Sequence, residues 1–326
     1  MVERFYEIRD PVHGFVAITA WEREIINHPC FQRLRRIRQL AWTEMVYPGA
    51  THSRFEHSLG VMHLATRMFD AIRDKNEDIL VNELKYERGD LERERVKVRL
   101  AALLHDVGHP PFSHAGEEVM PSMSDGKSFV HEHYSAAIVE SLMQDVIEQH
   151  STNQTNYHIT AKEVAELLRG DPTLGRSLLW RPLITGQLDA DRGDYLLRDS
   201  IHAGVAYGKY DLERLLVCVT LARDENDNPV FAIDESGWHV AESLIVARYL
   251  MFTQVYFHRT RRAYDHHISE VLQAVLKAQQ RRSPLAQKER FPPPTSKRKY
   301  SAGPMIAMSM KRQRPRPRTT CNSLRT

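Results

Sequence analysis

Histidine and carboxylate residues gather in four short segments of this 326-residue chain. The segments are Arg54-Phe55-Glu56-His57, His105-Asp106-Val107-Gly108-His109, Phe129-Val130-His131-Glu132-His133, and Asp189-Ala190-Asp191-Arg192-Gly193-Asp194-Tyr195. Imidazole nitrogens and carboxylate oxygens together bind divalent first-row metals. Histidine also exchanges protons near neutral pH. The segments therefore predict a metal site with acid–base groups.

The His105-Asp106 pair follows an apolar run that predicts a helix over residues 98–107, ended by Gly108 and Pro110-Pro111. An ionised carboxylate buried there is costly unless it is paired or bound to a metal. Neighbouring helical residues diverge by about 100°, so both can reach one ion only from a helix end that faces a cavity. With His57 and Asp191, the set offers two imidazoles and two carboxylates, which suits manganese, iron, zinc or magnesium.

Each of these residues also has an ordinary structural interpretation. A lone buried histidine is more often a hydrogen-bonded core residue than a ligand, and Asp191 could pair with Arg192 or Arg198. The order of the four segments favours the metal site over these alternatives. His131 and His133 are two residues apart, so on a helix at most one of them should line the site.

Several longer motifs resemble those of a known family. They are DPVHG (10–14), FQRLRRIRQL (31–40), YPGATHSRFEHSLGV (47–61), LLHDVGHPPFSH (103–114), LDADRGDYLLRDS (188–200) and RRAY (261–264). In these motifs the chain resembles the HD-domain metal-dependent phosphohydrolases, and among them the deoxynucleoside triphosphate triphosphohydrolases. The resemblance implies a mostly α-helical HD fold and one divalent ion, of unspecified identity, held by His57, His105, Asp106 and Asp191.

The resemblance also implies roles for ten further residues. Proton-transfer and supporting positions are matched by His109, His114, Glu117 and His131. Positions that hold the sugar and phosphates are matched by Gln39, Arg54, Arg192, Tyr195, Asp199 and Tyr264. Regulated relatives bind activating nucleotides through an acidic residue and an arginine; Arg35 matches the arginine, but Asn27 stands at the acidic position. Nucleotide activation is therefore not carried over.

Hydrolysis at phosphorus explains why such residues are needed. A metal ion and arginines neutralise charge on the phosphoryl oxygens. Metal coordination lowers the pKa of water, and the leaving 5′ oxygen needs a proton, for which His114 or His109 is the candidate donor. Gln39 and Asp199 suit a sugar hydroxyl, while Tyr195 and Tyr264 can bound the sugar, so that a tight sugar edge would favour deoxynucleotides.

The elements that must position these residues are mostly helices. Residues 1–20 predict two short strands around Asp10-Pro11, and a hairpin is expected near residues 217–233. Apolar spacing predicts helices within 34–41, from Ser53-Arg54-Phe55-Glu56 onward, and over 130–147, 161–168, 189–198 and 241–280. A charged, solvated excursion is expected at residues 75–95. The fold class is therefore mainly α.

The charge divides along the chain and predicts a domain over residues 1–280 followed by a tail over 281–326. The tail holds 13 of the 45 basic residues, one of the 42 acidic residues and seven of the 16 prolines. It is expected to be disordered. We hypothesise that it arises from a reading-frame change or truncation; the alternative is a natural basic tail that contacts nucleic acid nonspecifically through phosphates. The body alone carries a charge near −9.

Composition argues against a membrane-spanning protein and against a protein stabilised by disulfides. No run approaches the roughly 18 apolar residues of a membrane helix, and three scattered cysteines support no disulfide framework. We therefore expect a cytoplasmic protein with no membrane partner, a nucleotide substrate and, from the resemblance, a homo-oligomeric state. The leading prediction is dNTP triphosphohydrolase activity. The alternatives are a phosphatase acting on nucleoside monophosphates or other phosphoesters, and a non-catalytic nucleic-acid-binding or regulatory protein.

Overall fold

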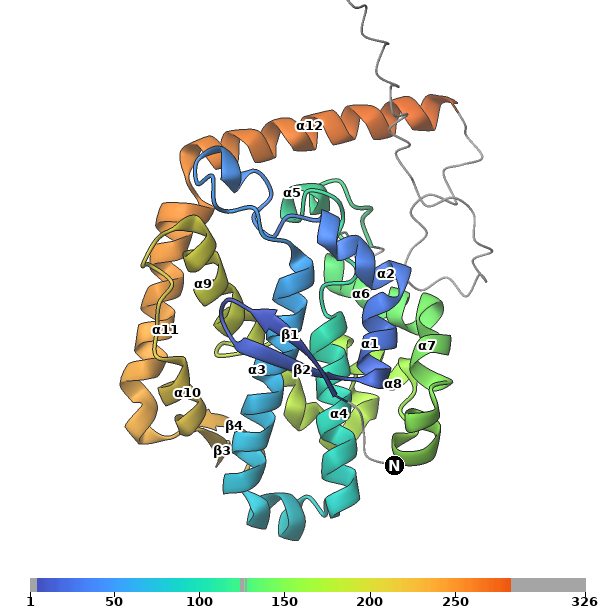
Figure 1. The fold of residues 1–326 in the computed structure, drawn as a ribbon, viewed down its shortest axis with the longest axis vertical. Helices are drawn as coiled ribbons and strands as arrows, with labels where there is room; N and C mark the ends of the chain where they lie inside the picture. Colours follow the sequence, from blue (N-terminus) through green and yellow to red (C-terminus); the bar gives the residue numbers. More distant parts are fainter. Residues whose placement is uncertain (1–4, 124–125, 127, 283–326) are drawn as a thin grey trace, which may run out of the picture. The chain divides into compact units, whose positions relative to one another are not determined.

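Helix α3 (Arg54–Lys75) is buried along most of its length and packs against α4 (Arg88–Leu104) and α9 (Ala190–Ala203). The structure is a computed structural model that describes residues 5–123, 126 and 128–282. Figure 1 shows α3 and α4 running side by side, with the remaining helices around them. The mainly helical fold class is confirmed.

The other helices complete the described part of the chain. The remaining α-helices are α1 (Ala20–Asn27), α2 (Pro29–Gln32), α5 (His114–Glu117), α6 (His131–Leu142), α7 (Gln144–Glu148), α8 (Ala161–Arg169), α10 (Leu212–Cys218), α11 (Trp238–Met251) and α12 (Arg259–Arg282). The 3-10 segments are η1 (Arg33–Arg36), η2 (Thr43–Met45), η5 (Pro172–Leu183) and η6 (Glu235–Gly237). The π-helical turns are η3 (Ile79–Glu83), η4 (Asn153–Tyr157) and η7 (Phe252–Tyr256).

Two small antiparallel sheets accompany the helices, as predicted. Strand β1 (Phe5–Asp10) pairs with β2 (Gly14–Thr19), and β3 (Val219–Arg223) pairs with β4 (Pro229–Ile233). Asp10 lies opposite Gly14 in the first pair, and its Oδ1 accepts the Val12 and His13 N–H groups. The carboxylate therefore organises the turn that the Asp-Pro motif predicted.

The helix predicted within residues 34–41 is wrong. Only η1 forms there, Ile37 is extended, and Ala41 has a φ of +47°. The backbone instead bridges to the segment before α3: Arg54 N–H donates to Ile37 O and Gln39 N–H donates to His52 O. The apolar residues are buried as their spacing required, but pairing with a distant segment replaced the helical hydrogen bonds.

The single helix predicted over residues 241–280 is two helices. Helix α11 ends at Met251 and passes into η7, which ends at Tyr256, and α12 begins at Arg259. Phe257 N–H donates to Phe252 O, five residues back, and the Arg261 guanidinium bonds to Tyr256 O. A side chain thus takes a carbonyl that a continuous helix would use, which is a recognised cause of a kink.

Two other elements differ from their predicted boundaries. The predicted 130–147 helix is divided at Met143 into α6 and α7, and part of the expected 75–95 excursion, from Arg88 onward, forms the first turns of α4.

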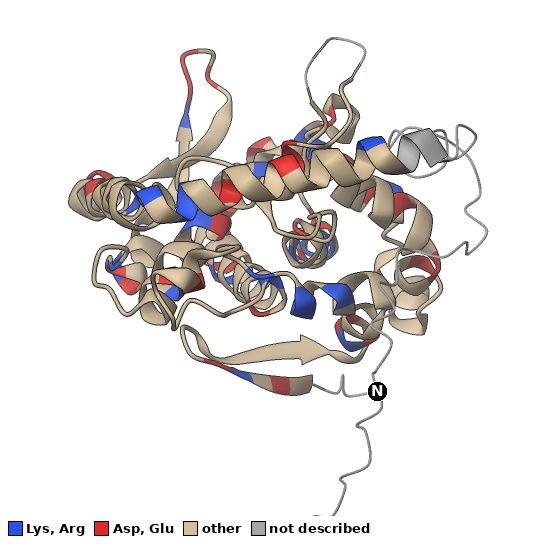
Figure 2. Ribbon diagram, turned by 90° about the horizontal axis from the view of Figure 1, so that it is seen from above, with Lys and Arg blue, Asp and Glu red and all other residues tan. Residues whose placement is uncertain are grey.

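Figure 2 shows acidic and basic residues interspersed on the same helices. The predicted tail lies outside the described residues from 283 onward. Within the described residues, no helix combines the length and apolar character needed to cross a membrane.

Candidate metal centre and the adjoining histidine cluster

The four predicted metal ligands come from three helix ends. His57 lies in the first turn of α3, His105 and Asp106 follow the last residue of α4, and Asp191 lies in the first turn of α9. Two of these ends are set by local hydrogen bonds: Glu56 Oε1 accepts the Ser53 N–H at 2.7 Å, and Asp189 Oδ1 accepts the Arg192 N–H at 2.7 Å. Such caps satisfy free N–H groups and define where each helix begins.

The structure brings all four side chains together. One ligand atom each from His57, His105 and Asp106 lies within 4.8 Å of the other two. Asp191 Oδ1 is 3.0 Å from His57 Nε2 and 3.8 Å from His105 Nε2. Asp106 is 2% exposed, whereas Asp191 is 35% exposed at its side chain and opens the site toward solvent. Asp191 pairs with neither Arg192 nor Arg198, which contact Asp189 and Asp194 instead.

Both histidines present Nε2 to the point where the four groups meet. His105 Nδ1 bonds to Ala102 O at 2.8 Å, which places the proton on Nδ1 and leaves Nε2 with a lone pair. Within the part of the chain that the structure describes, His105 Nε2 is buried without a hydrogen-bond partner. A buried nitrogen in that state is costly unless it is satisfied, and a divalent cation would satisfy it. The residues present therefore fit a bound metal ion.

Electrostatics around these residues favour a cation. Burial alone would lower the pKa of His57, but its hydrogen bonds to Asp191 and Asp194 raise that pKa to about 10. Burial alone would raise the pKa of Asp106, yet the Arg54 guanidinium and the neighbouring His105 and His109 hold it well below its ordinary value. The carboxylates thus stay anionic and attract positive charge to His57 Nε2, which a metal ion can supply in place of a proton.

Asp194 is a functional candidate that the sequence analysis did not single out. It is fully buried and accepts His57 Nδ1 at 2.8 Å, His13 Nε2 at 2.7 Å, and two guanidinium nitrogens of Arg198 at 2.8 Å. Arg198 also bonds to Asp10 Oδ2 at 2.8 Å. A carboxylate behind a metal-binding histidine orients the ring and fixes its tautomer. The signal was its place three residues after Asp191, together with the His13 motif.

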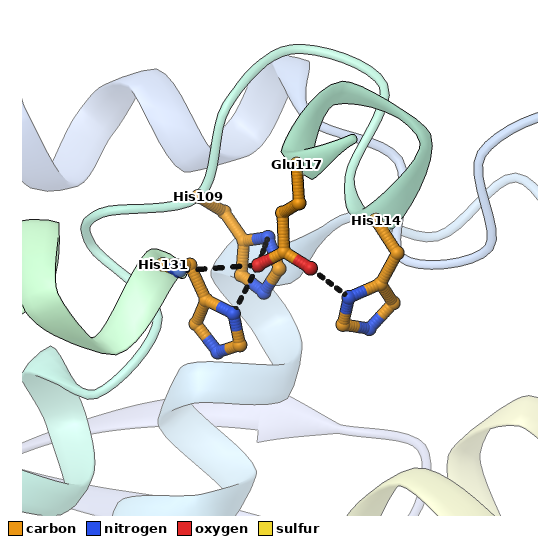
Figure 3. Close-up of side chains that lie close together, drawn as sticks. All are labelled: His109, His114, Glu117 and His131. Atoms are coloured by element: carbon orange, nitrogen blue, oxygen red, sulfur yellow. Dashed lines mark hydrogen bonds and ion pairs between the residues drawn. The ribbon is translucent and has the colours of Figure 1, made fainter. Parts of the chain in front are cut away.

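The four predicted proton-transfer residues form a cluster beside the metal centre (Figure 3). Glu117 Oε1 lies 2.5 Å from His131 Nδ1, and Glu117 Oε2 lies 2.7 Å from His114 Nδ1. The rings of His109 and His131 stack with centroids 3.6 Å apart. His133 turns away, its Nδ1 accepting the Val130 N–H. One histidine of this pair lines the site, in agreement with the helical-spacing argument.

Hydrogen bonds from these imidazoles hold Glu117 as an anion. Burial would raise the pKa of Glu117, but His114 and His131 lower it strongly. Glu117 in turn raises the pKa of His131 against the effect of burial. His109 lies deeper, and burial followed by the nearby Arg54 lowers its pKa well below the ordinary value. His114 is the most accessible member, with 59% of its side chain exposed.

Three predicted substrate-binding residues lie around this centre, and they differ in exposure and in the partners they already have. Arg54 is buried, bonding Asp106 Oδ2 at 2.5 Å and the Ser113 hydroxyl, so it positions Asp106. Gln39 is 7% exposed, and its Oε1 has no partner. Arg192 is paired with Asp189, with 23% of its side chain exposed.

The three other predicted contacts lie along α9 and α12. Asp199 is buried and already accepts His52 Nε2 at 2.7 Å and the Tyr256 hydroxyl at 2.6 Å. Tyr195 is half-buried beside Tyr256. Tyr264 is 40% exposed and stacks with Trp42, whose centroid lies 6.2 Å away. The sequence analysis assigned no role to His52, Tyr256 or Trp42, because only the fold brings them to these partners.

Comparison with known proteins finds two family models and several relatives that match this chain. Residues 54–199 match the HD domain, and residues 210–288 match the HD associated region. An uncharacterized protein of Methanocaldococcus jannaschii is 36% identical over 79% of this chain and 47% of its own length. A Gallus gallus protein named deoxynucleoside triphosphate triphosphohydrolase SAMHD1 is 32% identical over 82% of this chain and 44% of its own length.

A solved structure agrees with these relatives. A hypothetical protein from Aquifex aeolicus superimposes with a TM-score of 0.67 at 32% identity, covering 84% of this chain and 66% of that one. The chain spans about half the length of the curated relatives it matches. HD domains bind divalent metals, and residues 54–199, which match the HD domain, include all four candidate ligands. The chain therefore belongs to the HD-domain family, with an HD domain followed by an HD-associated region.

Proposed function

We propose that this chain is a metal-dependent hydrolase that cleaves deoxynucleoside triphosphates to deoxynucleoside and triphosphate. The observation that supports it most is the convergence of His57, His105, Asp106 and Asp191, with His105 Nε2 buried and making no hydrogen bond to any described residue. These four residues would hold one divalent ion. When bound, the ion supplies Lewis-acid polarisation of a phosphoryl oxygen and acidification of water.

Other residues of the chain would orient the metal ligands and neutralise charge on the phosphates. Asp194 keeps His57 Nε2 directed at the centre, and Arg54 fixes Asp106. Arg192 is the cation best placed to meet a phosphate, because part of its side chain is exposed beside Asp191. The Arg192 guanidinium can release the Asp189 carboxylate and bind phosphate oxygens instead. Its positive charge then stays paired with an anion before and after substrate binds.

Proton transfer falls to the histidine cluster. Hydrolysis adds water at the α-phosphorus and breaks its bond to the 5′ oxygen, which must gain a proton. His114 is our choice of donor because its side chain is exposed while Glu117 holds its Nδ1, leaving Nε2 free to face a substrate. A positioned acid of this kind contributes typically 10²–10⁴-fold to the rate.

Selection of the sugar is assigned to Gln39 and Tyr264. The unpartnered, buried Gln39 Oε1 can accept a hydroxyl hydrogen, and the exposed Tyr264 ring on Trp42 offers an apolar surface. Asp199 acts through His52 and Tyr256, which occupy both of its oxygens. We further propose a homo-oligomer, as the family resemblance implies.

A hydrolysis panel tests the proposed function. Purified chain is assayed with deoxy- and ribonucleoside tri- and monophosphates and with Mn²⁺, Fe²⁺, Zn²⁺ or Mg²⁺, beside Asp106→Ala and Asp191→Ala. We expect release of tripolyphosphate from deoxynucleoside triphosphates and loss of most of the rate in both variants, because each variant removes a metal ligand. Orthophosphate alone, released from a monophosphate, would show a phosphatase instead. Nucleic-acid binding without turnover would show the non-catalytic alternative.

A further inference from the structure

Beside the candidate metal centre, the histidine cluster brings together four side chains of the types that bind metal ions. His109, His114, Glu117 and His131 each offer one ligand atom, and these four atoms all lie within 4.8 Å of one another. Figure 3 shows the three rings gathered around the Glu117 carboxylate. They come from the turn after α4, from α5 and from the start of α6.

The rings approach Glu117 through the same nitrogen. Nδ1 lies 2.5 Å from a Glu117 oxygen in His131, 2.7 Å in His114 and 3.9 Å in His109. The opposite nitrogens of two rings face the metal centre: His109 Nε2 is 3.3 Å and His131 Nε2 is 3.6 Å from Asp106 Oδ1. The cluster is therefore adjacent to the metal centre but shares none of its four ligands.

His109 is the member whose surroundings are incomplete. Its side chain is fully buried, and its Nδ1 has no hydrogen-bond partner among the described residues although it faces Glu117. A buried nitrogen left without a hydrogen bond is energetically costly. A cation placed between the four groups would take this lone pair. Three imidazole nitrogens and one carboxylate oxygen form a four-ligand set typical of zinc.

We propose that His109, His114, Glu117 and His131 form a second divalent-metal site that takes Zn²⁺. A zinc ion there occupies the nitrogens of His109, His114 and His131. Resting on the proposed function, this occupancy also withdraws the candidate proton donors and slows hydrolysis. Zinc would then act on this chain in two ways: at the first centre as one possible cofactor, and at the cluster as an inhibitor.

Zinc stoichiometry tests the second site without relying on turnover. Metal-free full-length chain is titrated with Zn²⁺ by calorimetry and equilibrium dialysis, beside His114→Ala and Glu117→Gln. His133→Ala is the matched control, because His133 lies on α6 with the cluster residue His131 but outside the cluster. We expect two equivalents for the unaltered chain and for the control. In the two cluster variants we expect one of the two binding steps to weaken at least about tenfold.

Two controls keep the result interpretable. Circular dichroism and retention of one tight equivalent show that His114→Ala and Glu117→Gln are folded, and Asp191→Ala should keep the step that depends on His114. A single equivalent in the unaltered chain, or two unchanged steps in both cluster variants, would overturn the second site. Hydrolysis is assayed separately with Mn²⁺, Fe²⁺ or Mg²⁺ in place of Zn²⁺. Two zinc equivalents without any hydrolysis under those metals would leave the second site standing and refute the proposed function; hydrolysis with a single zinc equivalent would do the reverse.

Discussion

At the residue scale, Asp194 connects three side chains, one of which is the candidate metal ligand His57. Its two oxygens bond His13, His57 and Arg198, and Arg198 extends the network to Asp10 at the end of β1. All of these atoms are buried. A buried charge network is stable only while every member remains paired.

Asp194→Asn should therefore weaken metal binding without removing a ligand. An amide cannot accept from all three partners as a carboxylate does, so His57 loses its fixed orientation. We expect metal affinity to fall by about 10–100-fold, measured by calorimetry with Mn²⁺. Asp70→Asn is the control, since Asp70 pairs with Arg95 at the partly exposed surface, where ion pairs contribute little. Unchanged affinity in folded Asp194→Asn would contradict the positioning role.

At the scale of elements, the close approach of α3 and α9 depends on a missing side chain. A Cβ added to Gly60 on α3 would lie 1.9 Å from Asp194 Oδ1 and 2.4 Å from an Arg198 nitrogen. Gly108 shows the same constraint at the end of α4, where a Cβ would lie 2.2 Å from Ser135 N of α6. These glycines allow the helix ends to meet around the site.

Gly60→Ala should destabilise the fold because the buried Asp194–Arg198 pair would have to move. Overpacking of this kind costs typically about 1–3 kcal/mol, and we expect a loss in that range by urea denaturation. Gly89→Ala is the matched control: Gly89 lies in the first turn of α4, and a Cβ there meets nothing within 4 Å. The control should gain up to about 1 kcal/mol. Equal stabilities of the two variants would refute the packing argument.

At the scale of the whole molecule, the candidate metal centre brings together residues that are distant in sequence. His57, Asp106 and Asp191 belong to three helices, and the cluster adds α5 and α6. A ligand that binds only the folded chain stabilises it by about 2.7 kcal/mol at a concentration of 100 Kd. Metal binding should therefore stabilise the fold as a whole.

Removing divalent metal should lower Tm by several degrees. We expect the chain in EDTA to melt below the chain in excess Mn²⁺ in a thermal scan, because the ion links three helices only in the folded state. Asp191→Ala should show little of this difference, since it lacks one of the four ligands. The same Tm with and without metal in the unaltered chain would argue against a metal centre formed by these residues.

Much of the fold and of the candidate site was predictable because local rules govern it. The two hairpins follow from turn residues between apolar strands, and α3 begins where the Ser53–Glu56 cap predicted. The segments that carry His57, His105-Asp106 and Asp191 were identified as ends of helices. Their assigned roles as ligands stay a prediction, although the structure brings them together.

Tertiary structure alone decided what depends on contacts between distant segments. The chain around Ile37 has helical spacing, but pairing with residues before α3 overrides that weak local preference. The break between α11 and α12 depends on Arg261 reaching the Tyr256 carbonyl. Asp194 and Arg198 look like ordinary helix residues in sequence, and only burial against His13, His57 and Asp10 makes them a network. Sequence determined residue types and helix ends, whereas packing determined which of them share the low-dielectric interior where charges interact strongly.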